Sequence, residues 1–125
     1  MRDAAEGKIT GKVGEQIAVS FLKKNGYKIL EKNFRCRLGE IDIVAREGKN
    51  LVFIEVKTRK SNELGYPEEA VDLRKQRKIV AVALSYLQEK NISDKDIRFD
   101  VVAVLMTDSR PEIRLIQNAF ACHEI

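Results

Sequence analysis

Hydrophobic residues alternate with charged residues in two consecutive runs that a short turn sequence separates. The runs are Gly39–Arg46 and Leu51–Arg59, and Glu47-Gly48-Lys49-Asn50 joins them. Alternation with a period of two is typical of strands, and glycine at the first central position of a two-residue turn favours a type II′ hairpin. The pattern therefore predicts a β-hairpin in which Glu47 faces Asn50.

Counting back from this turn predicts the register of the hairpin. Asp42 then lies opposite Glu55, and Glu40 lies opposite Lys57. Side chains of a strand alternate between its two faces. One face should therefore carry these four residues with Val44 and Phe53. The other face should pack on a core through Ile41, Ile43, Ala45, Val52, Ile54 and Val56.

Opposed carboxylates in a hairpin need a compensating partner, because directly facing residues lie about 5 Å apart and like charges there are destabilising. A hard divalent metal is the simplest partner for Asp42 and Glu55, since Mg²⁺ is typically held by one or two carboxylates. The backbone carbonyl of Val56 is a further candidate ligand. In the alternative interpretation, Glu40 and Glu55 form ordinary surface ion pairs with Lys57, worth about 0–1 kcal/mol each. That interpretation leaves Asp42 facing Glu55 unexplained.

The other elements follow from helical and strand periodicity. A helix is predicted from Thr10, as N-cap, to Asn25, with Gly26 as its stop, and a strand over 27–34. A second helix is predicted from Tyr66-Pro67 to Lys90. A strand buried on both faces is predicted over 97–106, parallel to the second hairpin strand, and an edge strand over 112–117.

These elements predict an α/β fold with a mixed β-sheet flanked by helices, in the order α-β-β-β-α-β-β. The length of 125 residues predicts one domain over 1–125, with loose termini at 1–9 and 118–125. The basic loop between the hairpin and the second helix is predicted to begin at Lys57-Thr58-Arg59-Lys60.

Charge and composition narrow the class of protein. The net charge of +4 and pI near 9.1 suit a polyanionic partner, and they suit any basic cytosolic protein equally. Cys36 and Cys122 form no metal or redox motif, which favours a reducing compartment. The first residues do not form a signal peptide, and no apolar run is long enough for a bilayer. We expect a cytoplasmic protein that does not enter membranes.

The reaction chemistry depends on the acidic hairpin, since no serine or cysteine nucleophile motif and no phosphate-binding glycine loop are present. A lysine at position 57, beside a metal held by Asp42 and Glu55, suits orientation of a water and stabilisation of charge on a phosphate. The matching reaction is metal-assisted phosphodiester hydrolysis. Glu15 lies on the margin of the first helix's apolar stripe, and the residues alone favour a solvated glutamate there.

Several segments of the chain, taken together, resemble a known family. They are Gly11-x-x-Gly14-Glu15, Gly39–Ala45, Val52–Arg59 and a helix with Pro67, Ala70-Val71 and Lys75-x-x-Lys78. The Asp-x(n)-Glu-x-Lys pattern on a hairpin resembles the PD-(D/E)xK superfamily of nucleases, which includes restriction enzymes and Holliday-junction resolvases. The whole set is similar to the YraN family of predicted bacterial endonucleases.

This resemblance implies a restriction-endonuclease-like core, Mg²⁺ or Mn²⁺ as cofactor and a nucleic acid, DNA above all, as partner. It implies Asp42 and Glu55 as metal ligands, Lys57 as the catalytic lysine and Glu15 as an acidic residue supplied by the first helix. A resolvase-type activity further implies a homodimer.

Two functions from different classes follow from this resemblance. One is a metal-dependent endonuclease acting on DNA, including branched or damaged DNA. The other is a non-catalytic nucleic-acid-binding or assembly module on the same scaffold. Phosphate contacts in either case are expected from basic side chains, which otherwise are plain solvated charges: Arg37, Arg59, Lys60, Arg74, Lys75 and Lys78.

Overall fold

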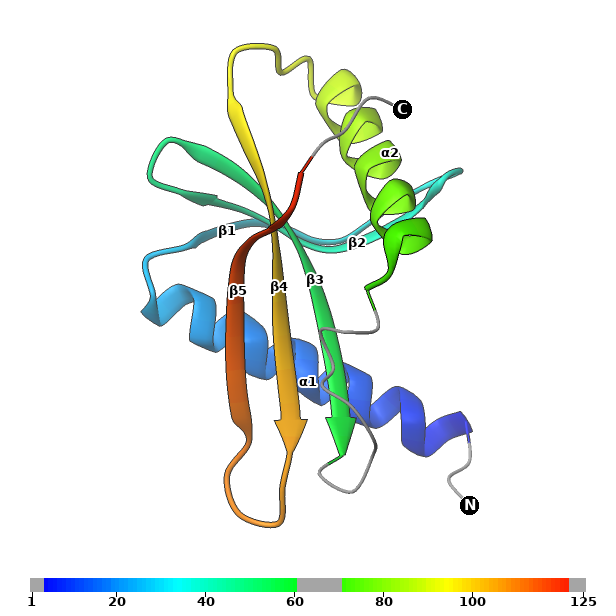
Figure 1. Ribbon diagram of the computed structural model, residues 1–125, viewed down its shortest axis with the longest axis vertical. Coiled ribbons are helices and arrows are strands. Elements are labelled where there is room, and N and C mark those ends of the chain that lie inside the picture. The colour runs from blue at the N-terminus through cyan, green and yellow to red at the C-terminus, as the bar shows by residue number, and fades with distance from the viewer. Residues whose placement is uncertain (1–3, 61–70, 122–125) are drawn as a thin grey trace.

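The protein is described here by a computed structural model that covers residues 4–60 and 71–121, with side chains from residue 11 onward. The elements are α1 (Ala4–Lys24), β1 (Lys28–Cys36), β2 (Gly39–Glu47), β3 (Asn50–Lys60), α2 (Leu73–Glu89), β4 (Asp96–Met106) and β5 (Glu112–Phe120). The predicted element order is thus confirmed. One mixed sheet holds the strands in the spatial order β1-β2-β3-β4-β5 (Figure 1).

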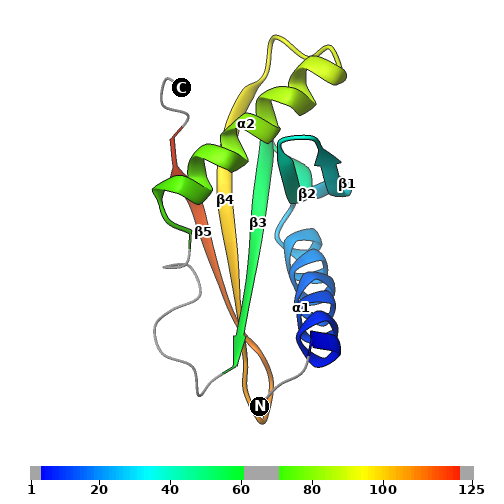
Figure 2. The same ribbon diagram turned by 90° about the vertical axis from the view of Figure 1, so that its right-hand side faces the viewer.

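The two helices cover opposite faces of this sheet, which gives three layers (Figure 2). Ala18 and Leu22 of α1 pack with Ile43, Val52 and other residues of one face. On the other face, α2 packs on a second cluster that includes Phe53 and the edge-on ring pair of Phe34 and Tyr86. The sheet is therefore buried on both sides at its centre.

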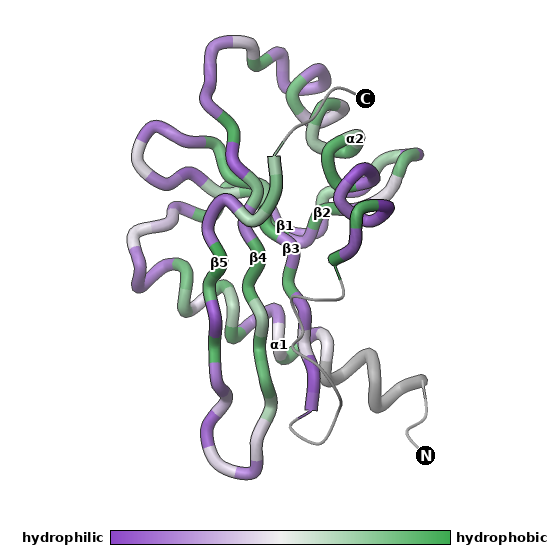
Figure 3. Tube along the Cα trace, in the orientation of Figure 1, coloured by the Kyte–Doolittle hydropathy of each residue, from purple (hydrophilic) through white to green (hydrophobic). Residues whose placement is uncertain are grey.

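Strand pairing agrees with the predicted hairpin and crossover. Glu47 faces Asn50, and Gly48 has a φ of +61° at the turn, a value that glycine adopts without strain. β3 and β4 pair in parallel, as expected for strands that a helix connects. Residues 99–104 of β4 are buried, and Figure 3 shows hydrophobic residues along this strand.

The first helix begins earlier than predicted. It starts at Ala4, so Thr10 lies inside it and is not its N-cap. Alanine and glutamate at positions 4–6 favour a helix, which explains why this polar segment is not a loose lead-in. The predicted end is right: Gly26 has a φ of +87°, and the N–H of Tyr27 donates to the Leu22 carbonyl at 3.0 Å in a Schellman turn.

Two further boundaries differ from the predictions. α2 begins at Leu73, and Asp72 is its N-cap, with a side chain that accepts from the Lys75 N–H at 2.9 Å. The predicted start at 66–70 lies outside the described residues. Lys57–Lys60, predicted as loop, continues β3 because its backbone pairs with Ala103–Met106 of β4.

The last strand also extends past its predicted end, so residues 118–120 are not a loose terminus. Asn118, a residue typical of turns, has a φ of +53° at a register shift between β4 and β5. Beyond this bulge, Phe120 stacks on Phe99 with ring centroids 5.0 Å apart. The bulge therefore redirects the strand without ending it.

A buried ionic network, which the sequence interpretation did not identify, stabilises this region. Asp100 has no exposed surface, and its carboxylate accepts hydrogen bonds from Arg98, the Tyr27 hydroxyl and the Asn118 N–H. Arg98 also donates to Glu47 at 2.9 Å. Burial raises the pKa of Tyr27 to about 12, so its hydroxyl stays protonated and able to donate.

No helix in the described part of the chain has the length and the apolar composition needed to cross a membrane.

Candidate active site

The candidate site forms where β3 bends away from β2 (Figure 1). The paired positions of these strands run from Glu47↔Asn50 to Ile43↔Ile54, and Asp42 and Glu55 follow directly after the last pair. Here the Asp42 carboxylate replaces the strand partner: its Oδ2 accepts from the Val56 N–H at 2.8 Å. The predicted register is confirmed as far as Ile43, and the two acidic residues lie at the point of divergence.

The divergence also changes two predicted neighbours. Ile41 packs in the cluster beneath α2 with Val44, not on the α1 face, because the β1–β2 ribbon twists once β2 leaves β3. Glu40 does not pair with Lys57. Its Oε2 lies 3.0 Å from Nε of Arg35 on β1, the strand to which β2 stays paired.

Glu55 is a buried carboxylate, with only 6% of the residue exposed. Two lysines approach its Oε1: Nζ of Lys57 at 3.5 Å and Nζ of Lys75 at 3.7 Å. Lys57 comes from the same strand and face, and Lys75 comes from the first turn of α2. Lys75, predicted to contact phosphate, is therefore brought to the acidic pair.

Asp42 is the electrostatically costly member of the pair. Burial is the largest cause that raises its pKa, the Glu55 charge adds to it, and the Val56 N–H acts against both. The charges of Glu15 and Glu40 contribute further, and the pKa of Asp42 reaches about 7. The metal-free site therefore holds this carboxylate partly protonated at neutral pH.

Replacing Asp42 with asparagine is expected to stabilise the metal-free protein in a pH-dependent way. A raised folded-state pKa means that the folded protein binds more protons than the unfolded chain between pH 4 and 7, so stability falls as pH rises through that window. Asparagine still accepts from Val56 and avoids the cost. We expect a gain of about 2 kcal/mol at pH 8 that falls to about 0.5 kcal/mol at pH 4.5, measured by urea denaturation in EDTA. An equal gain at both pH values would contradict this origin.

Glu15 reaches the site because α1 packs very closely on β3. A Cβ added at Gly14 would overlap the side chain of Thr58, so only glycine permits this approach. Asn33 of β1 then donates from Nδ2 to Oε1 of Glu15 at 2.9 Å. Asn33 was not among the predicted site residues. Its φ is +56°, and the one signal in the sequence is that asparagine tolerates such backbone angles better than most residues.

Gly14→Ala is therefore expected to push α1 away from β3 and to cost about 1–3 kcal/mol of stability. The matched control is Gly11→Ala in the same helix, where an added Cβ meets no atom within 4 Å. That control should be neutral or stabilising by up to about 1 kcal/mol, since alanine favours helices. Thermal unfolding of both variants checks the prediction, and equal effects would contradict it.

The predicted phosphate-binding residues divide into three groups. Lys75 lies at the acidic pair. Arg59 and Lys60 are half-buried on β3 just beyond Lys57. The others are exposed on the β1–β2 turn and on α2: Arg37, Arg74 and Lys78.

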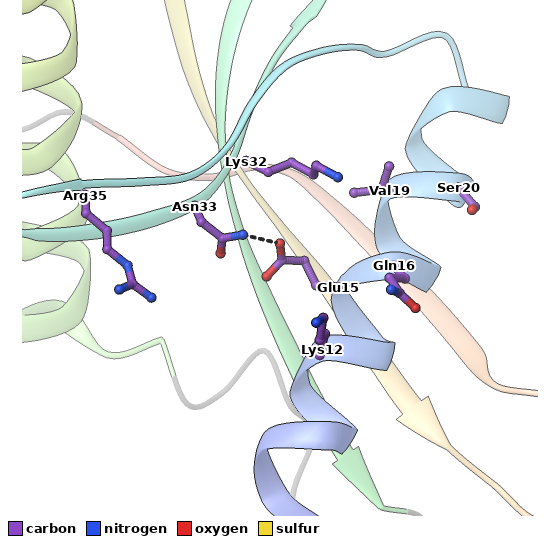
Figure 4. Close-up of a pocket in the computed structure, with 8 residues that line it drawn as sticks. All are labelled: Lys12, Glu15, Gln16, Val19, Ser20, Lys32, Asn33 and Arg35. Carbon is purple, nitrogen blue, oxygen red and sulfur yellow. Dashed lines mark hydrogen bonds between the residues drawn. The ribbon is translucent and has the colours of Figure 1, made fainter.

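A cleft of about 550 Å³ lies beside Glu15, between α1 and β1 (Figure 4). Its lining includes Lys12, Glu15 and Ser20 of α1 with Lys32, Asn33 and Arg35 of β1. Glu15 and Asn33 thus belong both to this cleft and to the surroundings of the acidic pair. Neither Lys12 nor Lys32 was among the predicted phosphate contacts.

The donor set that remains for a metal consists of two carboxylates and one backbone carbonyl. Within 11–60 and 71–121, no group of three or more His, Cys, Asp or Glu side chains is placed to hold an ion. Since the N–H of Val56 points to Asp42, its carbonyl is directed to the same side of the strand, away from β4. Oxygen donors of this kind suit Mg²⁺ or Mn²⁺.

The mixed sheet, with the acidic pair at the point where β2 and β3 diverge, defines an α/β protein with a candidate active site. Residues 14–104 match the Uncharacterised protein family UPF0102, and the chain belongs to this family, which confirms the predicted YraN relationship.

Relatives in this family match over nearly their whole length. The UPF0102 protein of Geotalea daltonii is 53% identical over 116 residues, which are 92% of this chain and 91% of that protein. The protein from Syntrophus aciditrophicus is 50% identical over 89% of this chain and 87% of its own length.

Among solved structures, the Holliday junction resolvase Hjc of Archaeoglobus fulgidus is similar with a TM-score of 0.45 and 20% identity. The match covers 86% of this chain and 71% of that chain.

Proposed function

We propose that the protein is a metal-dependent endonuclease that hydrolyses phosphodiester bonds in DNA, including branched or damaged DNA. The observation that carries this proposal is the arrangement at the strand divergence. There the buried carboxylate of Glu55, with Lys57 and Lys75 within 4 Å, lies next to Asp42. The Asp42 and Glu55 carboxylates repel each other, so bringing them together costs free energy. Such like-charge pairs are typical of functional sites.

Asp42, Glu55 and the carbonyl of Val56 would hold Mg²⁺ or Mn²⁺, and the repulsion between the two carboxylates gives a cation a reason to bind there. Such an ion, when bound, acidifies a water and neutralises charge on a phosphate. Asp42 is fixed for this role by its hydrogen bond from Val56, which orients the carboxylate.

The lysines and Glu15 supply the remaining chemistry in this proposal. Lys57 is half-buried beside Glu55, so its amino group can orient a water or help to deprotonate it near the reacting phosphate. The same group can stabilise the charge that develops on the phosphate. Lys75 lies at the first turn of α2 and can contact the substrate phosphate. Glu15, which accepts a hydrogen bond from Asn33, would orient a water on the α1 side.

A cleavage assay on a labelled panel tests this function. The panel comprises duplex, single strand, flap and four-way-junction DNA with an RNA counterpart, each incubated with Mn²⁺, Mg²⁺ or EDTA. Cutting that needs metal and disappears in Lys57→Ala is the expected result, and that variant also excludes a contaminating nuclease. Lys23→Ala, an exposed lysine of α1, is the matched control and should cut normally.

A non-catalytic nucleic-acid-binding or assembly module is the second candidate. One observation favours it: Glu55 already has two lysine partners, which offset its charge without a metal. This function would be supported if the protein binds one member of the panel equally well with and without metal and cuts none of them under any condition.

A further inference from the structure

The cleft beside Glu15 carries a positive lining that the proposed hydrolytic chemistry does not use. Lys12, Lys32 and Arg35 line it from two different elements, and all three are exposed. Arg35 pairs with Glu40 at 3.0 Å. Neither Lys12 nor Lys32 forms a hydrogen bond or an ion pair with any residue that the structure describes. Two lysines that have no partner among the described residues therefore line the same hollow.

The position of the cleft connects it to the acidic pair. Asn33 lies on β1 between the pairs Lys32↔Ile43 and Phe34↔Ile41, and so across from Asp42. Figure 4 shows the Asn33 amide hydrogen-bonded to the Glu15 carboxylate, with Lys32 and Lys12 on either side of this pair. A chain that lies in the cleft would therefore lead directly to Asp42.

The chemistry of the lining selects the kind of ligand. Its charged groups are mainly basic, its neutral polar groups are amides and a hydroxyl, and none of its described residues is aromatic. Bases of single strands are usually held by aromatic stacking, which this lining cannot provide. Lysine and arginine with neutral polar groups instead match phosphate and sugar oxygens.

The shape of the cleft selects the form of the nucleic acid. A hollow of about 550 Å³ bounded by a helix and a strand is comparable in volume to a small-molecule pocket, so it matches a short piece of one strand better than the full width of a duplex. We therefore expect an unpaired strand to fit this hollow best.

We propose that this cleft binds the sugar–phosphate backbone of one unpaired DNA strand and thereby gives the protein a preference for substrates with single-stranded or branched segments. That the bound strand then reaches the scissile bond rests on the proposed function; the binding itself does not.

The test compares two double variants that remove the same charge from the same elements. Lys12→Gln/Lys32→Gln changes the cleft, and Lys23→Gln/Lys28→Gln changes exposed lysines of α1 and β1 that do not line it. Fluorescence anisotropy in EDTA gives the Kd of each protein for single-stranded, flap and duplex DNA at several salt concentrations.

The cleft variant is expected to bind the single strand and the flap about tenfold more weakly, and the slope of log K against log salt should fall in magnitude by about 1.4 for two lost phosphate contacts. The control variant should stay within about twofold of the original protein, and duplex binding should change little in either. Equal losses in the two variants, or an equal loss on duplex and single strand, would overturn the proposal.

Cleavage measured on the same substrates separates this proposal from the proposed function. Selective loss of single-strand binding in the cleft variant, with no metal-dependent cutting by the original protein, supports the cleft and rejects the nuclease. Metal-dependent cutting with identical binding by the two double variants supports the nuclease and rejects the cleft.

Discussion

Glu55→Gln is expected to lose both divalent-metal binding and cleavage while it keeps its fold. Glutamine has nearly the same shape, so the packing of β3 is preserved, but the negative charge that faces Lys57 and Lys75 disappears. Two positive charges would then lie beside one remaining carboxylate, Asp42, and repel a cation. We expect cleavage to fall by about a hundredfold or more, and Mn²⁺ binding measured by calorimetry to become undetectable.

The matched control for this variant is Glu40→Gln. Glu40 lies on β2 two residues before Asp42, but its carboxylate pairs with the exposed Arg35. Removing this charge should change the cleavage rate by less than about threefold, because surface ion pairs contribute little. Circular dichroism and thermal unfolding establish that both variants are folded. If Glu55→Gln bound Mn²⁺ with the affinity of the wild-type protein, Glu55 would not be a metal ligand and the proposed metal site would be wrong.

The second large effect is expected far from the acidic pair. Asp100→Ala should reduce the free energy of unfolding by about 3–5 kcal/mol, because it leaves Arg98, the Tyr27 hydroxyl and the Asn118 N–H without their buried acceptor. Urea denaturation at pH 7 measures this loss.

Glu47→Ala is the comparison that shows how much burial of the carboxylate contributes to the free energy of unfolding. Glu47 also accepts from Arg98, but a third of its side chain is exposed (34%), so water replaces the lost bond and the cost should stay near 1 kcal/mol or below. Asp100→Asn should fall between the two, since it keeps the shape and loses the charge. Similar losses for Asp100→Ala and Glu47→Ala would contradict a role for the buried network.

Local sequence patterns predicted the hairpin because its determinants lie in one continuous stretch, 39–59. Gly48 sets the turn, and alternation sets which residues follow it, so the positions of Asp42 and Glu55 were accessible without a structure. The order of the elements followed from the same periodicities. The ends of helices and strands were harder to predict from the sequence, as the starts of α1 and α2 show, because capping residues and propensities are weak signals.

Contacts between distant segments could not be predicted in this way. Tyr27 meets Asp100 across 73 residues of sequence, and Lys75 reaches Glu55 from another element. One local signal was present: Arg98 and Asp100 lie two apart in an otherwise apolar strand, so they share a face where a charge needs a partner. Glu15 could be assigned only through the family resemblance, since its approach depends on how α1 packs at Gly14.

The hydrogen bond from the Val56 N–H to Asp42 makes this amide a spectroscopic probe of the site. Its proton is bonded to a carboxylate and not to a neighbouring strand, so its NMR chemical shift should follow the charge on Asp42. A single ¹⁵N-labelled amide would then report proton uptake in the metal-free protein. In titrations it would also report the arrival of a cation before any catalytic turnover is measured.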